Sequence, residues 1–157
     1  MRGQRNRLQV KDKQFEEMPF VIGPRNHAVS MRITHPQFSA NAISRMMKLK
    51  PEIQWSVGDP DPRKTAEGLP VAKARKTTYW VYRAKVLAGS DLEDTIARQL
   101  KLLRRKKRSI AKILESGGTI QFFVGIFLDK NRGGTFKWEM LVTLGELNID
   151  LALDIYP

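Results

Sequence analysis

The two histidines, His27 and His35, are the first residues whose chemistry could support catalysis. A histidine base needs a nucleophile within hydrogen-bond reach. The sequence nominates none, since it contains neither a cysteine nor a G-x-S-x-G motif. We expect His27 at the start of a strand and His35 in a turn beside Pro36. Both histidines are therefore interpreted as structural, and no enzymatic activity is expected.

Four aspartates are the candidates for metal binding or for a carboxylate pair. Asp59 and Asp61 stand in the sequence G-D-P-D-P, which has the wrong spacing for an EF-hand loop and lacks its closing glutamate. Turn formation explains both residues. Asp150 and Asp154 alternate with apolar residues and fit the outer face of a strand. The phosphate-binding patterns G-x-x-x-x-G-K-[ST] and G-x-G-x-x-G are missing as well, so we expect no metal and no cofactor.

The basic residues are the strongest functional signal, because the chain has a net charge of +12 and a pI of about 10.2. Such a charge attracts nucleic acid, anionic lipid or an acidic partner. Five bases at spacings of three and four fall on one helical face: Arg98, Lys101, Arg105, Arg108 and Lys112. These bases would either contact phosphates of RNA or DNA, or form the solvent-exposed face of the helix. In the second case the aliphatic parts of their side chains would cover apolar surface.

A helix over residues 90–115 must position these bases. Ser90 and Glu93 fit a capping box at its start, and Gly117 and Gly118 end it. Lys107 occupies a place where the apolar stripe requires Leu or Ile, which favours a kink near 104–107 that would split the basic stripe. The apolar stripe itself consists of Ile96, Leu100, Leu103, Ile110 and Leu114.

Five strands and two further helices complete the predicted order β-α-β-β-α-β-α-β. Alternation of apolar and polar residues predicts the strands, at 27–33, 53–57, 77–86, 119–128 and 149–156. The helices are predicted at 40–49, capped by Ser39, and at 136–147, capped by Thr135 with Leu141 among its inward residues. The first six elements match a ferredoxin-like, split βαβ arrangement, extended by a C-terminal helix and strand, with all helices on one face of the sheet.

The strand at 119–128 is apolar on both sides, which predicts a central position in the sheet. Its second side and the neighbouring strands would then leave an open face. That face carries Ser30, Arg32, Gln121, Phe123, Phe127, Asp150, Asp154 and Tyr156. Aromatic residues and arginine among polar neighbours are typical of a protein interface. The alternative is that the N-terminal arm covers this face through Phe15, Phe20 and Ile22.

Domain organisation is predicted to be simple, with a basic N-terminal arm at 1–25 and one α+β domain at 26–157. The N-terminus lacks the apolar core of a signal peptide, and no stretch approaches the ~20 apolar residues that span a bilayer. The absence of cysteine excludes disulfides and suits a reducing compartment. We expect a cytoplasmic protein without a membrane partner.

Several short segments resemble a known family when they are read in order. They are H-A-V-S-M-R-I, F-S-A-N-A-I-S-R-M-M-K-L-K-P, W-S-V-G-D-P, K-T-T-Y-W-V-Y and L-G-E-L-N-I-D-L-A-L-D-I-Y. Together, from about His27 to Tyr156, they resemble the bacterial domain-of-unknown-function family 4279. The resemblance implies a small α+β domain without an established activity, some relatives of which are suggested to act as binding proteins in toxin–immunity neighbourhoods. It implies no catalytic residues.

The sequence therefore predicts a non-catalytic binding module that acts through protein contacts, with another protein or with a second copy of itself. The contact residues would be Arg32, Phe123, Phe127, Asp150, Asp154 and Tyr156. The alternative is a nucleic-acid-associated protein that uses the arm and the basic helix at 98–112.

Overall fold

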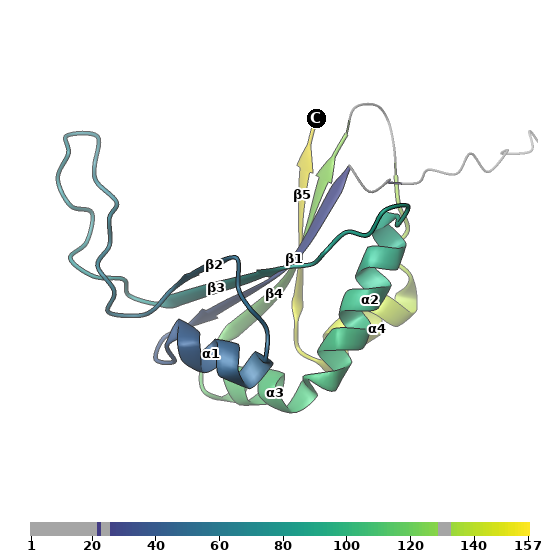
Figure 1. Ribbon diagram of the computed structural model, residues 1–157, viewed down its shortest axis with the longest axis horizontal. Coiled ribbons are helices and arrows are strands. Elements are labelled where there is room, and N and C mark those ends of the chain that lie inside the picture. Colours follow the sequence, from purple (N-terminus) through teal and green to yellow (C-terminus); the bar gives the residue numbers. More distant parts are fainter. Residues whose placement is uncertain (1–21, 23–25, 129–132) are drawn as a thin grey trace, which may run out of the picture.

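The computed structural model describes residues 22, 26–128 and 133–157 of the 157-residue chain and shows an α+β fold (Figure 1). The described strands are β1 (His27–His35), β2 (Ile53–Trp55), β3 (Thr78–Arg83), β4 (Thr119–Phe127) and β5 (Asp150–Tyr156). The described helices are α1 (Ala40–Met47), α2 (Leu92–Arg105), α3 (Lys107–Glu115) and α4 (Trp138–Glu146). The predicted α+β class is confirmed.

The five strands form one mixed sheet in the order β2-β3-β1-β4-β5. β1 pairs antiparallel with both β3 and β4, and β2 pairs antiparallel with β3. β5 joins β4 in parallel and forms one edge of the sheet. β4 is therefore an interior strand, as its two apolar sides predict.

The register gives the sheet two distinct faces. On one face, which we call the helix face, Met31 lies opposite both Tyr82 and Phe122. Its buried residues include Val29, Met31, Ile33, Trp80, Ile120, Phe122 and Val124. On the other face, which we call the open face, Arg32 lies opposite Gln121, and Gln121 lies beside Asp150. The predicted alternation of β1, β3 and β4 is confirmed.

All four helices lie on the helix face, and no described helix covers the open face (Figure 1). Their apolar residues and those of the sheet form a single core. Trp80 is fully buried there, and its indole Nε1 donates a hydrogen bond of 2.8 Å to Ser44 Oγ on α1. The buried indole N–H of Trp80 is therefore hydrogen-bonded. The opposite face of the sheet takes no part in this core.

Helix α1 begins as predicted, because Ser39 Oγ accepts a hydrogen bond from the backbone N–H of Ala42. Its end was predicted two residues late. The helix stops at Met47, and Lys48 adopts the left-handed conformation with φ of 51°. A left-handed residue is a common way for a helix to end.

The predicted long helix at 90–115 is wrong at its cap, and the kink expected within it is present. Its cap is Asp91, which accepts from the N–H of Asp94, whereas Ser90 Oγ accepts from Arg98 Nη1. The helix is also interrupted at Lys106, whose N–H bonds to Leu103 O, three residues back, at 2.8 Å. The expected kink near 104–107 is therefore confirmed, as a full break between α2 and α3 (Figure 1).

Helix α4 was predicted at 136–147 with Thr135 as its cap, and this is wrong at the start. The capping residue is Lys137, which provides no side-chain hydrogen bond. Leu141 was predicted to face inward but is exposed, and Thr143 is buried in its place. Thr143 tolerates burial because its hydroxyl donates to Glu139 O and accepts from Arg104 Nη2.

Ile22 is the one described residue of the apolar arm positions. It is buried, and its carbonyl accepts a hydrogen bond of 3.0 Å from Leu92 N–H at the start of α2. Ile22 therefore belongs to the core of the helix face, so the idea that it covers the open face is wrong. Phe15 and Phe20 lie outside the described residues. Within the described part of the chain, no helix is long and apolar enough to cross a membrane.

Candidate functional site

The open face carries a continuous row of aromatic and charged side chains from three adjacent strands. The Arg32 guanidinium of β1 lies 3.3 Å from the centre of the Phe123 ring of β4. Phe127, at the end of β4, stacks on Tyr156 of β5 with 5.1 Å between ring centres. We call these four residues the aromatic row. The predicted interface residues Arg32, Phe123, Phe127 and Tyr156 are thus placed together.

Gly125 lies close to the rings of both phenylalanines. A Cβ atom at this position would lie 3.6 Å from Phe123 Cε1 and 3.8 Å from Phe127 Cζ. Both rings therefore lie over the glycine, where a larger side chain would separate them. The row is half-exposed, with Phe127 and Tyr156 each retaining 42% of their accessible surface.

Charge differs between the two ends of the aromatic row. At one end Arg32 Nε is buried and has no hydrogen-bond partner in the described structure. At the other end the Tyr156 hydroxyl donates to Asp154, and this bond raises the pKa of Tyr156. Asp150 is exposed at the start of β5. The open face therefore offers a cation, aromatic rings and two carboxylates to a partner.

The histidines take structural roles. His35 was expected in a turn, but it ends β1 and is fully buried. Its Nδ1 accepts from the N–H groups of Gln37 and Phe38, at 2.9 and 2.7 Å, so its proton resides on Nε2 and is donated to Ser116 Oγ. This tautomer cannot take a proton from Ser116, and burial lowers the pKa of His35. His27 Nε2 lies 3.0 Å from Thr95 Oγ1.

Asp59 and Asp61, the candidate metal ligands, form hydrogen bonds and ion pairs within the long β2–β3 loop. Asp59 Oδ2 accepts from Ser56 N–H at 2.7 Å. The carboxylate of Asp61 pairs with Arg63 at 2.6 Å and with Arg75 at 3.4 Å. The hydrogen bond from Arg63 lowers the pKa of Asp61 to about 2. Both carboxylates thus have local partners, and no cluster of three metal-ligating side chains occurs among the described residues.

One catalytic pattern was overlooked in the sequence: S-I-A-K at 109–112 matches S-x-x-K. This spacing is typical of a serine nucleophile paired with a lysine base. In the structure, however, Ser109 Oγ donates a hydrogen bond of 2.8 Å to the carbonyl of Met46. The hydroxyl therefore ties α3 to the end of α1.

The five predicted anion-binding residues do not form one stripe. Arg98 is half-buried and donates to Ser90 Oγ and Thr95 Oγ1. Lys101 and Arg105 lie on α2, whereas Arg108 and Lys112 follow the break at Lys106 on α3. The break separates the bases into two groups on helices with different directions (Figure 1).

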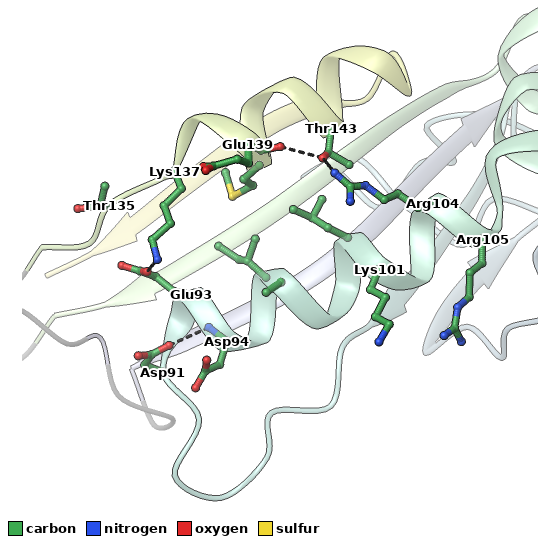
Figure 2. Close-up of a pocket in the computed structure, with 14 residues that line it drawn as sticks. Asp91, Glu93, Asp94, Lys101, Arg104, Arg105, Thr135, Lys137, Glu139 and Thr143 are labelled. Carbon is green, nitrogen blue, oxygen red and sulfur yellow. Dashed lines mark hydrogen bonds and ion pairs between the residues drawn. The ribbon is translucent and has the colours of Figure 1, made fainter.

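A groove of about 700 Å³ lies between α2 and α4, and its lining includes Lys101 and Arg105, whose side chains extend away from α4 in Figure 2. Its floor is formed by Ile96, Leu100 and Met140. Arg104 spans the two helices through its 2.6 Å bond to Thr143 Oγ1. The other charged lining residues are Asp91, Glu93, Asp94, Glu139 and Lys137, and Lys137 Nζ lies 3.2 Å from Glu93 Oε2. Cations and carboxylates therefore both line the groove.

Exposed apolar residues on α4 and β5 were missed. Trp138 is 70% exposed, and Leu141 and Val142 lie beside it at helical spacing. Leu153 and Ile155 of β5 are also exposed, at 47% and 58%. The spacing of Trp138, Leu141 and Val142 is the signal that could have indicated a second apolar side of α4.

The sequence profile described as Domain of unknown function (DUF4279) matches residues 25–157. The chain belongs to the DUF4279 family. The match confirms the resemblance seen in the short sequence segments, and it begins immediately before β1. No curated protein and no solved structure matches the chain. The DUF4279 assignment therefore supplies neither an activity nor a binding partner.

Proposed function

We propose that this DUF4279 protein is a non-catalytic binding module that acts through protein contacts made by the open face of its sheet. The aromatic row is the observation that carries the proposal. It combines arginine with aromatic rings, which are enriched where proteins meet, on a face without a described helical layer. Arg32, Phe123, Phe127, Tyr156, Asp150 and Asp154 would make the contacts.

The fold offers support for this use of the sheet. We interpret β1 to β4 with α1 and the α2–α3 pair as a ferredoxin-like unit. The support is the antiparallel pairing and the order β2-β3-β1-β4. In this interpretation α4 and β5 extend the sheet at the β4 side. An extension there widens the face that bears the aromatic row.

Self-association is the first form of contact to test. Light scattering across a concentration series would compare the wild type with Phe127→Asp, which places a charge in the row. Leu69→Asp is the matched control, because Leu69 is exposed on the distant β2–β3 loop. If the wild type dimerises and Phe127→Asp weakens the dimer by about 2 kcal/mol, as loss of an interface hot spot does, a homodimer is supported. If the wild type is a monomer at all concentrations, the proposed partner is a different protein.

A toxin is one such partner, in the manner of the toxin–immunity binding that the resemblance implies for some relatives. We place this activity in the bacterial cytoplasm, because a cysteine-free chain suits a reducing compartment. Co-purification of the wild type and of Phe127→Asp with each protein encoded beside it would test this form. A neighbour retained equally by both variants would contradict contact through the aromatic row.

Nucleic-acid association remains the second candidate, favoured by one observation. Lys101, Arg105, Arg108 and Lys112 have no ion-pair partner in the described part of the chain. Binding to generic RNA and duplex DNA across a salt series tests it, since each neutralised phosphate steepens the salt dependence by about one unit of slope. We expect Arg98, Lys101, Arg105 and Arg108 changed together to Glu to abolish any such binding. No binding of the wild type at low salt would remove this candidate.

A further inference from the structure

Among the described residues, no strand lies along the outer edge of β5, and the direction of the backbone groups of β5 follows from one hydrogen bond. Leu128 N–H donates to Tyr156 O at 2.9 Å. Tyr156 therefore directs its backbone polar groups toward β4. Because this direction alternates along a strand, the N–H and C=O groups of Leu151, Leu153 and Ile155 point away from β4. No described strand pairs with that edge.

The side chains of the same residues are also incompletely covered. Leu153 and Ile155 lie on the helix face, yet about half of each side chain is exposed. Large apolar residues on an open edge are uncommon in stable monomers, where charge, proline or a covering segment usually blocks such an edge. The exposed side chains and the free backbone groups therefore coincide at Leu153 and Ile155.

The charged residues of α4 and β5 themselves are all acidic. Residues 138–157 contain Glu139, Glu146, Asp150 and Asp154 and no lysine or arginine, in a chain with a net charge of +12. Asp150 and Asp154 share the open face of β5, and neither forms an ion pair with a described cation. An added strand would therefore meet leucine and isoleucine on one face and two carboxylates on the other.

We propose that the edge of β5 binds an extended segment of another protein that alternates apolar and basic side chains, added as an antiparallel sixth strand. The inference rests on the proposed function of protein binding. It adds a second contact region, the edge of β5, and the chemistry of the segment that would bind there. Strand addition of this kind draws affinity from main-chain hydrogen bonds and specificity from alternate side chains. The apolar residues lie beside Leu153 and Ile155, and the basic residues lie opposite Asp150 and Asp154.

A second copy of the chain fits this edge less well. An antiparallel pair of β5 strands centred on Leu153 would place the two Asp154 side chains on the same face as diagonal neighbours. Like charges at such positions repel, and each copy carries a net charge of +12. A basic segment instead places opposite charges across the new pair.

Nuclear magnetic resonance titration with a capped nine-residue peptide of alternating Lys and Val tests the proposal. We expect shifts centred on the amides of Leu151, Leu153 and Ile155, and weaker binding as salt increases. A peptide in which Glu replaces every Lys should bind at least tenfold more weakly. Equal binding of both peptides, shifts centred elsewhere, or no shifts at millimolar peptide would overturn the proposal.

N-methylated peptides test the geometry without changing the protein. In an antiparallel pair, facing residues share a face, so the valines would face Leu153 and exchange its hydrogen bonds. N-methylation of the valines should abolish binding, whereas N-methylation of the lysines should preserve it. The reverse pattern would overturn the assigned edge.

Variants separate this inference from the proposed function. Leu153→Pro removes the outward N–H and should abolish peptide binding, whereas Leu153→Ala should retain weaker binding. Phe127→Asp should leave peptide binding intact while it disrupts contacts of the aromatic row. If Leu153→Pro leaves peptide binding unchanged, the proposed binding at the edge of β5 is refuted, but the proposed function of the open face is not. If Leu153→Pro abolishes dimerisation, the edge of β5 binds a second copy of the chain instead.

Discussion

The guanidinium of Arg32 lies 3.3 Å from the centre of the Phe123 ring, on the face of the sheet opposite the helices. The two residues come from neighbouring strands and are not directly opposed, since Phe123 lies opposite Ser30. The contact therefore depends on side-chain direction as well as on register. It orders one end of the aromatic row, and side chains that are already ordered lose less conformational entropy if they enter an interface.

A double-mutant cycle measures this contact. We expect Arg32→Gln to lower the free energy of unfolding by about 1 kcal/mol, because a cation over a ring contributes ~0.5–2 kcal/mol. In a Phe123→Leu background the same change should cost clearly less. Urea denaturation of the four proteins gives the coupling energy. Arg83→Gln is the control, since Arg83 forms an exposed ion pair with Glu52; equal costs of Arg32→Gln in both backgrounds would contradict the stacking.

Gly118 should be irreplaceable by alanine. A Cβ atom there would lie 2.7 Å from His35 Cδ2 and 2.8 Å from the carbonyl oxygen of Ile113. We expect Gly118→Ala to cost about 3 kcal/mol, as overpacking against backbone does. Gly145→Ala is the opposite case, because nothing lies within 4 Å of its added methyl and alanine favours a helix by ~1 kcal/mol. Thermal unfolding of both variants would reveal the contrast, and a tolerated Gly118→Ala would refute the close approach.

His35 makes stability depend on pH. Its folded pKa lies below the ordinary value of 6.5, because burial disfavours the charged ring. The unfolded chain therefore binds more protons than the folded protein at this residue. The contribution of the neutral His35 ring to the free energy of unfolding is complete above pH 6.5 and is lost as pH falls through the folded pKa. His35→Asn keeps an acceptor near Nδ1 and should remove this part of the pH dependence. Urea unfolding between pH 7.5 and 4.5 compares the two proteins; an identical slope in both would count against the neutral, buried ring.

Asp61 should hold the β2–β3 loop together. Its carboxylate joins Arg63 to Arg75, and Arg75 in turn lies over the Trp55 ring at 4.2 Å. We expect Asp61→Asn to speed hydrogen exchange at the amides of Gly58 and Arg75, which bond across the loop. Because the pKa of Asp61 is lowered to about 2, the wild-type loop should lose this protection only as pH falls below the ordinary carboxyl range of ~4. Unchanged exchange in Asp61→Asn would mean that the ion pairs do not order the loop.

The strands were largely predictable because their chemistry is periodic. Alternation in β1, β3 and β4 assigned each residue to the correct face, and the placement of Phe123 and Phe127 opposite the helices followed from it. The register with β5 then determined that Tyr156 meets Phe127. The stack of Arg32 on Phe123 was not predictable, since it depends on rotamers and on the space above Gly125.

Helix ends and buried polar groups were less predictable because local alternatives are equivalent. Ser90–Glu93 and Asp91–Asp94 both offer a cap; Asp91 takes this role, and the Ser90 hydroxyl accepts from Arg98, two turns further along α2. Thr143 is buried in place of Leu141 because Arg104 and a backbone carbonyl satisfy its hydroxyl. These outcomes depend on tertiary partners that local sequence does not specify.

Site-specific photocrosslinking in the cells that produce the protein tests the central claim most directly. A photoreactive phenylalanine analogue would replace Phe127 in the aromatic row, and in a second protein it would replace Leu69, which is more exposed but lies on the distant loop. The account predicts a discrete protein adduct from position 127 that position 69 does not give. No protein adduct from position 127, or the same adducts from both positions, would contradict a protein-binding role for the open face.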